Sequence, residues 1–293
     1  MSLSPWHILY RGPLSSCNYA CGYCPFAKTR NTAQELQEDA RCLERFTDWA
    51  GRQERSLHIL FTPWGEALIH RSYQEALVRL TNFTCVERAA IQTNLSCGLA
   101  WAERCDLSRL ALWTTWHPGE VSLEKFLRKC REALARGIRF SVGVVGRREA
   151  FDDIRRLRGA LPPEVYVWVN AWKREPDYYS AQDFALLESV DPHFRWNAAP
   201  HPSRGRACRS GHTAFTVDGA GDARRCHFIP AKIGNIYDGN FAARLAPSPC
   251  TAAECRCHIG YVHMPELKLY ELYRDGIMER IPADWPQVST SGR

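Results

Sequence analysis

Residues 15–26 have the sequence SSCNYACGYCPF, which places three cysteines within eight positions. Cys17, Cys21 and Cys24 are spaced C-x3-C-x2-C, and the aromatic Tyr23 stands directly before the last of them. A structural zinc site needs four closed ligands, often from two separated C-x2-C pairs, and no fourth soft ligand lies near this loop. A 4Fe-4S cluster held by only three thiolates keeps one iron open to a ligand from outside the protein. The spacing therefore favours an iron–sulfur cluster over zinc.

The composition indicates a globular chain without export or membrane signals. Its 293 residues, of which 45% are hydrophobic, suffice for one large domain, or one domain with an appendage. The N-terminus lacks a basic region followed by an apolar run, and no run of about eighteen apolar residues occurs anywhere. We therefore expect a cytoplasmic protein with no membrane partner. Its thirteen cysteines would be free thiols, which in a reducing compartment bind metal more often than they form disulfides.

The charge gives no indication of a nucleic-acid partner, and none is expected. The net charge of +6 is modest and spread along the chain, with arginines grouped at 147–158 and 204–209. Solvated faces explain most of this charge, and an acidic electron donor or an anionic substrate is the alternative.

The order of apolar and amphipathic segments predicts six βα units. Strands are expected at 6–10, 57–61, 87–92, 110–115, 138–146 and 165–170, and helices at 32–54, 72–80, 99–104, 122–137, 151–161 and 181–190. Near-continuous apolar strands that alternate with helices imply an α/β fold with a parallel sheet, either doubly wound or a partial barrel. In both folds the chemistry gathers at the carboxyl ends of the strands, and the cysteine loop directly follows the first strand.

A change of composition near residue 200 predicts a domain boundary. The following segment is rich in Gly, Ala, Arg and Ser, and residues 213–226 read as a hairpin around the turn DGAG. Five cysteines fall between residues 208 and 257. We expect domains at 1–199 and 200–263, and a tail at 264–293 that contains one helix at 265–276.

The cysteine loop resembles the signature of the radical S-adenosylmethionine (radical SAM) superfamily, which is C-x3-C-x-aromatic-C after the first strand of a partial (βα)6 barrel. The predicted order of elements resembles that architecture over about residues 5–190. The resemblance implies a partial (βα)6 TIM-like barrel with a small C-terminal β-hairpin iron–sulfur domain. It also implies that Cys17, Cys21 and Cys24 hold a 4Fe-4S cluster whose open iron binds SAM.

The chemistry that this resemblance implies is radical chemistry. In that superfamily one electron from the cluster cleaves SAM reductively, and the resulting 5′-deoxyadenosyl radical abstracts a hydrogen atom from the substrate. The cofactor carries out the difficult step, while the protein orients it and excludes water. The electron would come from a low-potential donor such as a flavodoxin or a ferredoxin.

Two further residues resemble residues that contact SAM in this superfamily. Tyr23 would pack near the adenine, or alternatively fill space beneath the loop. The sequence FTPWGEAL offers Gly65 and Glu66 for the Gly-Gly-Glu motif that receives the ammonium group of SAM, and a carboxylate just past a strand suits a cation. Trp64 stands where the family has its first glycine, which puts the local backbone path in question.

Polar residues after the third and fourth strands complete the expected SAM site. Asn94, in the stretch IQTNLS, is a candidate for a polar contact near SAM or for a helix cap. Thr115 and His117, in TTWHP, stand where family members place groups for the ribose or carboxylate of SAM. A structural histidine is the alternative for His117.

The C-terminal cysteines resemble the auxiliary iron–sulfur domains called SPASM or twitch, and five are too few for two complete all-cysteine clusters. The resemblance implies one auxiliary 4Fe-4S cluster, with Cys208 and Cys226 as ligands and two more from Cys250, Cys255 and Cys257. A zinc ribbon or a partly liganded cluster are the alternatives. Histidines in the same segment are further possible ligands: His212, His227, His258 and His263.

Two classes of function follow. The first is a radical SAM enzyme of the oxidoreductase or maturase type, acting on a peptide, a protein or a small molecule. Residues past the sixth strand are candidates for substrate contacts: Asn170, Trp172, Lys173 and Tyr178. The second class is a non-catalytic iron–sulfur or zinc module with a redox or binding role.

Overall fold

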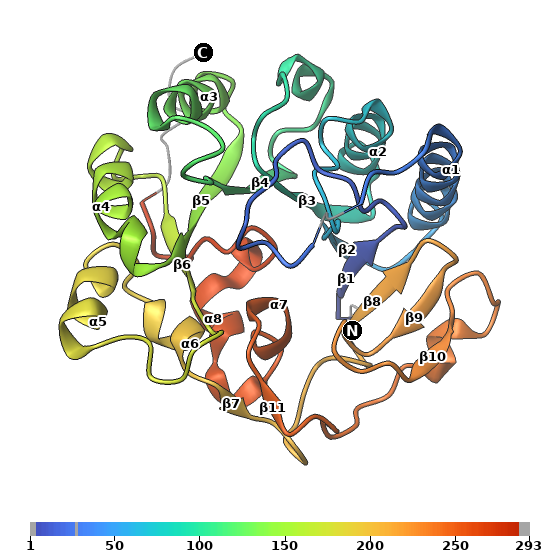
Figure 1. Cartoon of the computed structure of the whole chain (residues 1–293). Helices are drawn as coiled ribbons and strands as arrows, with labels where there is room; N and C mark the ends of the chain where they lie inside the picture. The colour runs from blue at the N-terminus through green and yellow to red at the C-terminus, as the bar shows by residue number, and fades with distance from the viewer. Residues whose placement is uncertain (1–3, 27–28, 287–293) are drawn as a thin grey trace.

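The computed structural model describes residues 4–26 and 29–286. Its main sheet has nine strands in the order β10-β9-β8-β1-β2-β3-β4-β5-β6. Six of them pair in parallel with their neighbours along the chain: β1 (Trp6–Arg11), β2 (Leu57–Phe61), β3 (Val86–Thr93), β4 (Leu110–Thr115), β5 (Arg139–Gly146) and β6 (Val167–Ala171). Figure 1 shows the sheet curving into an open barrel with helices on its outside. The α/β partial barrel that the sequence predicts is confirmed.

Helical segments follow the six strands. They are α1 (Ala33–Ala50), α2 (Arg71–Thr81), η1 (Ala100–Arg104), α3 (Leu123–Ala135), α4 (Phe151–Ala160), preceded by η2 (Arg148–Ala150), and α5 (Ala181–Glu188). Thr32 and Ser180 begin α1 and α5 with capping boxes, and the Ser122 hydroxyl caps α3. The helix expected at 99–104 is a short 3-10 helix, and the other five form near their predicted bounds. No helix in the described ranges is long and apolar enough to cross a membrane.

The predicted hairpin forms, and it extends the barrel sheet. β8 (Ala214–Asp218) pairs in parallel with the free edge of β1, and β9 (Asp222–Arg224) and β10 (Lys232–Asn235) continue antiparallel. An unpaired strand edge exposes a row of backbone hydrogen-bonding groups, so this pairing satisfies the open side of the barrel. The segment after residue 200 thus shares a sheet with the barrel, and its division into a separate domain stays a prediction.

The remaining elements are short. They are α6 (Phe194–Ala198), β7 (His201–Pro202) paired with β11 (Glu254–Cys255), η3 (Phe241–Arg244), α7 (His258–Tyr261), η4 (Pro265–Leu267), α8 (Leu269–Tyr273) and η5 (Arg274–Gly276). The prediction of one continuous helix at 265–276 was wrong. Lys268 and Arg274 have positive φ angles of 53° and 46°, a conformation that a right-handed helix does not contain, and they divide the segment into three pieces.

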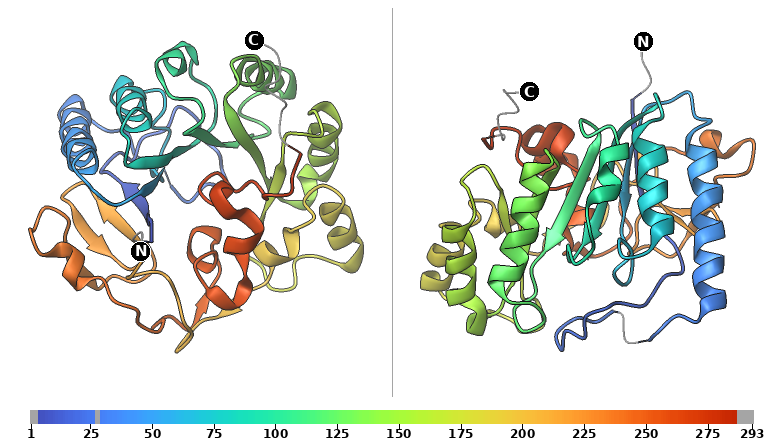
Figure 2. Two further views of the ribbon diagram at one scale, coloured as in Figure 1. Left: turned by 180° about the vertical axis from the view of Figure 1, so that it is seen from behind. Right: turned by 90° about the horizontal axis from the view of Figure 1, so that it is seen from above.

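Alternating side chains of the strands build two separate cores. Outward residues such as Ile8 and Phe61 pack against the helices, whereas inward residues such as Leu9 and Trp113 pack against the C-terminal segment inside the barrel. In the right panel of Figure 2 this red segment lies at one end of the barrel and the cysteine loop lies at the other. The C-terminal segment therefore closes the barrel at the amino ends of its strands and leaves the carboxyl ends for the site.

Buried ion pairs hold this C-terminal segment in place. Glu279, with no exposed surface, accepts a hydrogen bond from Arg139 Nε at 2.5 Å and lies 3.7 Å from Arg88 Nε. The fully buried Arg280 pairs with Asp191 at 3.7 Å. Removing one member of a buried pair leaves the other charge uncompensated, which is more costly than losing a surface pair.

We therefore predict that Glu279→Gln destabilises the protein. The expected loss is about 3 kcal/mol of unfolding free energy, because the buried Arg88 and the partly buried Arg139 lose the fully buried carboxylate between them. Anaerobic denaturant titration of the full chain measures it. The control is Glu103→Gln, whose ion pair with Arg136 is 70% exposed on the Glu103 side and for which a loss of only ~0.5 kcal/mol is expected. Equal losses in the two variants would contradict the assignment.

Candidate active site

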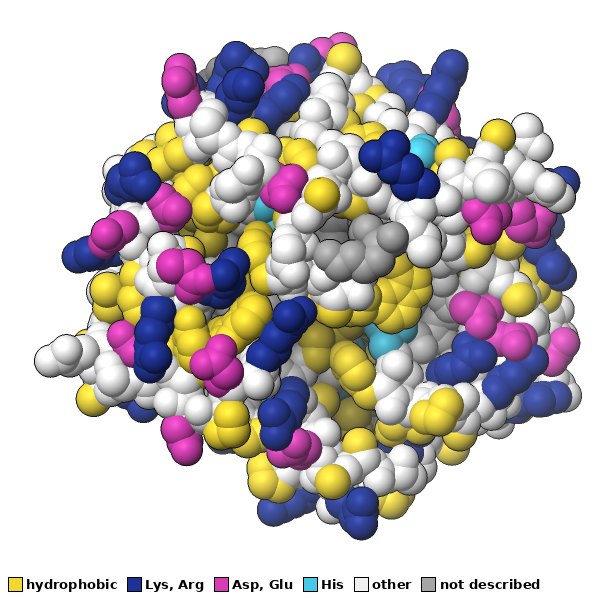
Figure 3. All heavy atoms as spheres, viewed as in Figure 1, with side chains coloured by type: hydrophobic (Ala, Val, Ile, Leu, Met, Phe, Trp, Pro, Cys, Tyr) yellow, Lys and Arg dark blue, Asp and Glu magenta, His cyan; other side chains and the backbone are white. Residues whose placement is uncertain are grey.

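A cavity of ≈ 450 Å³ lies at the carboxyl ends of the barrel strands. Loops after β1, β2, β3, β4 and β6 line it, because parallel strands all end at the same side of the barrel. Figure 3 shows this face of the molecule hollowed near its centre, with hydrophobic and cationic side chains around the opening. The structure brings all the residues expected at the SAM site into this lining: Cys17, Cys21, Cys24, Tyr23, Glu66, Asn94, Thr115 and His117.

The cysteine loop is held by contacts to neighbouring loops. The backbone N–H groups of Ser15 and Ser16 donate to the Asn31 side chain at 2.8 and 2.9 Å. The N–H of Glu66 donates to the carbonyl of Ser16 at 3.1 Å. A Cβ at Gly65 would stand 1.8 Å from that carbonyl oxygen, so the loops after β1 and β2 approach too closely for any other residue.

The close approach also shows which position of this loop requires glycine. The position that requires glycine is Gly65, which is present. Trp64 instead places its side chain at the cavity, 38% exposed, with its ring centroid 4.6 Å from that of Phe26.

The loop offers three soft donors to the cavity. Cys17, Cys21 and Cys24 form no disulfide within the described residues, and burial raises the pKa of Cys17 and raises that of Cys21 to about 11. Iron binding would have to displace the thiol protons, since thiolates are the ligands. Among the described residues no three His, Cys, Asp or Glu side chains come close enough together to hold a metal ion, so the thiols would have to draw together around a cluster. Their donor type and common cavity fit an iron–sulfur group.

Glu66 is a buried carboxylate with an organised set of donors. Thr93 Oγ1 donates to it at 2.7 Å, the N–H of Asn94 at 2.5 Å and the N–H of Leu68 at 3.1 Å. Burial nevertheless raises the pKa of Glu66 to about 7, so that it is poised between its two forms at neutral pH. A cation that arrives in the cavity would favour the ionised form.

Asn94 joins the third strand's loop to the cysteine loop. Its Nδ2 donates to Asn18 Oδ1 at 2.9 Å, and its Oδ1 accepts from the N–H of Ser96 at 3.0 Å. The side chain lines the cavity and closes a local turn, which is compatible with a contact near SAM. The alternative of a helix cap was wrong, because η1 begins after Leu99 and no side chain caps it.

Tyr23 and His117 form a pair within the lining. Tyr23 Oη lies 2.7 Å from His117 Nδ1, and the two rings are stacked with centroids 6.0 Å apart. Burial lowers the pKa of His117 to about 4, so the imidazole is neutral at pH 7. His117 therefore positions Tyr23, while Thr115 lines the cavity at the end of β4.

The five C-terminal cysteines lie beside the barrel mouth as free, partly exposed thiols: Cys208, Cys226, Cys250, Cys255 and Cys257. Burial raises the pKa of Cys226, and the neighbouring thiols of Cys208 and Cys250 raise it further. Burial raises the pKa of Cys255 to about 12, and the thiols of Cys226 and Cys257 contribute to this rise. No three of these thiols lie close enough together within the described residues to hold a metal ion, so they too would have to draw together around a cluster.

Two of the four histidines in this segment belong to the core. His258 is buried, and neither of its ring nitrogens has a hydrogen-bond partner within the described ranges. His263 is also buried, and its Nδ1 lies 2.8 Å from Tyr270 Oη. His227 Nε2, in contrast, lies 3.0 Å from the hydroxyl of Thr62 at the carboxyl end of β2.

Arg11 is absent from the site residues that the sequence predicts, and Trp64 is predicted at the site without a ligand contact. Arg11 ends β1, and its guanidinium carbon lies 3.9 Å from the centre of the Trp64 ring. The available signal was alternation: Leu9 faces the barrel interior, so Arg11 faces it too.

Comparison with known proteins identifies the fold. No protein-family model matches the sequence, and no curated protein matches it. A structure of anSMEcpe with bound AdoMet (SAM) superposes with a TM-score of 0.52 at 14% identity, covering 83% of this chain and 82% of that chain. A second structure of anSMEcpe, with AdoMet and the Cp18Cys peptide, gives 0.51 at 13% identity over 94% and 98%. The chain has the fold of anSMEcpe. BtrN in complex with AdoMet superposes less well, with a TM-score of 0.39 at 16% identity over 83% and 86%.

We predict that Gly65→Ala prevents iron binding by the cysteine loop of this barrel. The added methyl group would collide with the carbonyl of Ser16 and displace the loop. Iron per chain after anaerobic reconstitution measures the effect, in a background where Cys208 and Cys226 are alanine so that only this loop contributes. Gly22→Ala is the matched control in the same loop, because a Cβ there meets no atom within 4 Å. Iron retained by Gly65→Ala at the control level would refute the prediction.

Proposed function

We propose that the protein is a radical SAM enzyme, with Cys17, Cys21 and Cys24 as the ligands of its 4Fe-4S cluster. The observation that carries the proposal is the convergence of these three thiols and the buried Glu66 on one cavity. When bound, the cluster and SAM would supply a 5′-deoxyadenosyl radical that abstracts a hydrogen atom from the substrate. The fold that this chain shares with AdoMet-bound anSMEcpe supports the same reading.

The chain's own residues would orient SAM in this cavity. Glu66 would receive the ammonium group, because it is a buried carboxylate that its three donors hold in a fixed position. Tyr23 would offer its ring, held by His117, to the adenine, and Thr115 and Asn94 would add polar contacts. Aromatic side chains at the rim, Phe26 and Trp64, would help to exclude water from the reaction.

The test is the release of 5′-deoxyadenosine. Anaerobically reconstituted protein with dithionite and SAM should release it, and the variant with alanine at Cys17, Cys21 and Cys24 should not. A cluster-loaded wild-type protein that releases none would favour a non-catalytic iron–sulfur module over the enzyme. Product is measured by chromatography with mass detection, and iron content is determined on the same samples.

The C-terminal thiols support an auxiliary 4Fe-4S cluster of the SPASM or twitch kind. We assign its ligands to Cys208, Cys226, Cys250 and Cys255, because the effects on the pKa of Cys226 and Cys255 link these four thiols to one another. Cys257 acts on the pKa of Cys255, but also on the pKa values of Arg11, Lys173 and Tyr261, which are not ligands of a cluster. Cys257 is thus the thiol left over.

This assignment predicts a difference between two neighbouring cysteines. In the background with alanine at Cys17, Cys21 and Cys24, about four irons should remain per chain. Adding Cys257→Ala should leave that number unchanged, whereas adding Cys255→Ala should remove most of it. Iron and sulfide analysis measures both. Loss of iron in the Cys257 variant with retention in the Cys255 variant would reverse the assignment.

For the substrate we propose a peptide or protein, with oxidation of a small molecule as the alternative. The support is the solved structures of anSMEcpe with the Cp18Cys and Kp18Cys peptides, which have the same fold. Residues at the end of β6 line the cavity and are available for such contacts: Asn170, Trp172 and Lys173. A low-potential donor such as a flavodoxin or a ferredoxin would supply the electron.

A further inference from the structure

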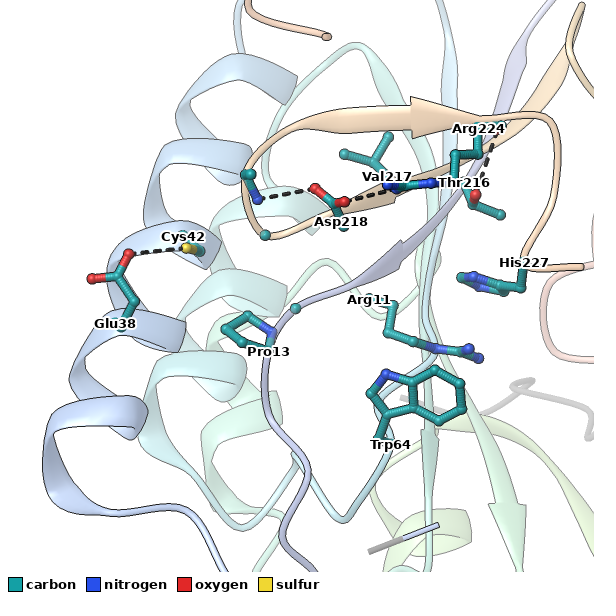
Figure 4. A pocket seen from close by; sticks show the side chains of 13 residues that line it. Arg11, Pro13, Glu38, Cys42, Trp64, Thr216, Val217, Asp218, Arg224 and His227 are labelled. Atoms are coloured by element: carbon teal, nitrogen blue, oxygen red, sulfur yellow. Dashed lines mark hydrogen bonds and ion pairs between the residues drawn. The ribbon is translucent and has the colours of Figure 1, made fainter. Parts of the chain in front are cut away.

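A second cavity, of ≈ 570 Å³, lies at the carboxyl ends of β1 and β8. Trp64 lines this cavity as well as the first one, so the two meet at its indole. Figure 4 shows Arg11 in this second cavity, above the Trp64 ring and with His227 on its other side. Arg11 and His227 have no part in the function proposed above.

Arg11 is held in a fixed orientation. Its Nε donates to the carbonyl of Thr62 at 2.6 Å, and the guanidinium stacks on Trp64 at 3.9 Å. Neither terminal NH2 group makes a hydrogen bond within residues 4–26 and 29–286. A guanidinium anchored through Nε and by its face presents these two groups as a fork, which is the geometry that binds a carboxylate through two parallel hydrogen bonds.

The positive charge of Arg11 lacks a counter-ion in the part of the chain that the structure describes. Burial lowers its pKa to about 10, which leaves it protonated at neutral pH. The other guanidinium of the cavity, Arg224, is paired with Asp218 at 2.7 Å, and burial lowers the pKa of His227 to about 3, so that ring is neutral. Glu38, the other carboxylate of the lining, is paired with Arg41 at 2.5 Å. Among the charged side chains of the cavity, Arg11 is therefore the one without an ion-pair partner in the described residues. Such a charge is costly to desolvate unless an anion joins it.

We propose that Arg11 binds a carboxylate group of the substrate, and hence that the substrate is an acid. The proposal rests on the proposed function, because Trp64 lines both cavities and so places this one next to the site proposed for SAM. A single cation suits a singly charged carboxylate better than a doubly charged phosphate, which would leave one charge unmatched. The carboxylate would belong either to an aspartate, a glutamate or the C-terminus of a peptide, or to a small free acid.

The thiol of Cys257 is the side chain that could compete with a substrate carboxylate for Arg11, because it tends to raise the pKa of Arg11. The cation that lies against the loop of Cys255 and Cys257 is Lys173. Its Nζ donates to the carbonyl of Arg256, directly before Cys257, and the thiols of Cys257 and Cys255 both act on its pKa. With Lys173 beside these thiols, the fork of Arg11 stays available to a ligand in the cavity.

The test uses the cluster-loaded full chain with SAM and anaerobic calorimetry. The probes are N-acetylglutamate α-amide for a peptide side chain, butyrate for a small acid, N-acetylglutamine amide as the neutral isostere, and inorganic phosphate. At least one carboxylate probe should bind better than the isostere, and Arg11→Gln should weaken it by about tenfold or more. Arg45→Gln is the matched control, since Arg45 stacks on Tyr237 at 3.6 Å outside both cavities. It should bind the probe like the wild type.

A second measurement uses only the wild-type protein and so does not depend on how the variant folds. Phenylglyoxal modifies accessible guanidinium groups, and the carboxylate probe should protect Arg11 from it, as read by peptide mass spectrometry. Equal binding of acid and isostere, absence of protection, or preference for phosphate would overturn the proposal. So would an Arg11→Gln variant that loses iron but keeps its affinity for the probe. Release of 5′-deoxyadenosine by the wild type tests the proposed function separately, because it needs no carboxylate.

Discussion

Parallel hydrogen bonding on both edges of β1 determines where the rest of the site lies. β2 pairs with one edge from Trp6 to Tyr10, and β8 pairs with the other from His7 to Arg11. A strand fixed on both sides cannot slip by one residue without turning its core side chains to the opposite face. The alternation along β1 therefore fixes the outward core and the inward Arg11, and the cysteine loop starts at the end of the same strand.

Glu66 in the first cavity and Arg11 in the second each lack an ion-pair partner within the described ranges. Glu66 is buried with neutral donors, and the carboxylates that line the cavity of Arg11 are paired with other arginines. Burying each charge costs free energy that the protein's own contacts only partly offset, as the pKa of Glu66 near 7 indicates. Ligands with complementary charges would recover that cost. The arrangement suits two ligands side by side, one presenting a cation and the other an anion.

Sequence patterns predicted those parts of the structure that depend on local order. The six strands, five of their helices and the hairpin follow from periodicity and capping, and the gathering of the cysteine loop with Glu66, Asn94 and His117 follows from the rule that parallel strands end at one edge. The roles of these residues toward a cluster and SAM stay predictions.

What the sequence did not reveal depends on packing between distant segments. Arg11 gains its significance from Trp64 and from His227, more than two hundred residues away along the chain. The break of the tail helix at Lys268 likewise follows from the path of the chain into the barrel, because no proline or glycine marks that position. Periodicity describes one element at a time, and these features arise only when several elements meet.

The C-terminal segment links the stability of the barrel to the position of the second set of thiols. Cys255 and Cys257 pack against the inner core, and His258, the next residue, is buried between the rings of Trp113 and Tyr273. Close packing of this kind admits little local movement without loss of contacts. The loop of Cys255 and Cys257 is thus held by the same segment that Glu279 and Arg280 hold inside the barrel. If the packing at the amino ends of the barrel strands loosens, the distance between the two groups of cysteines is no longer fixed. Any transfer of electrons between the two groups would depend on that distance.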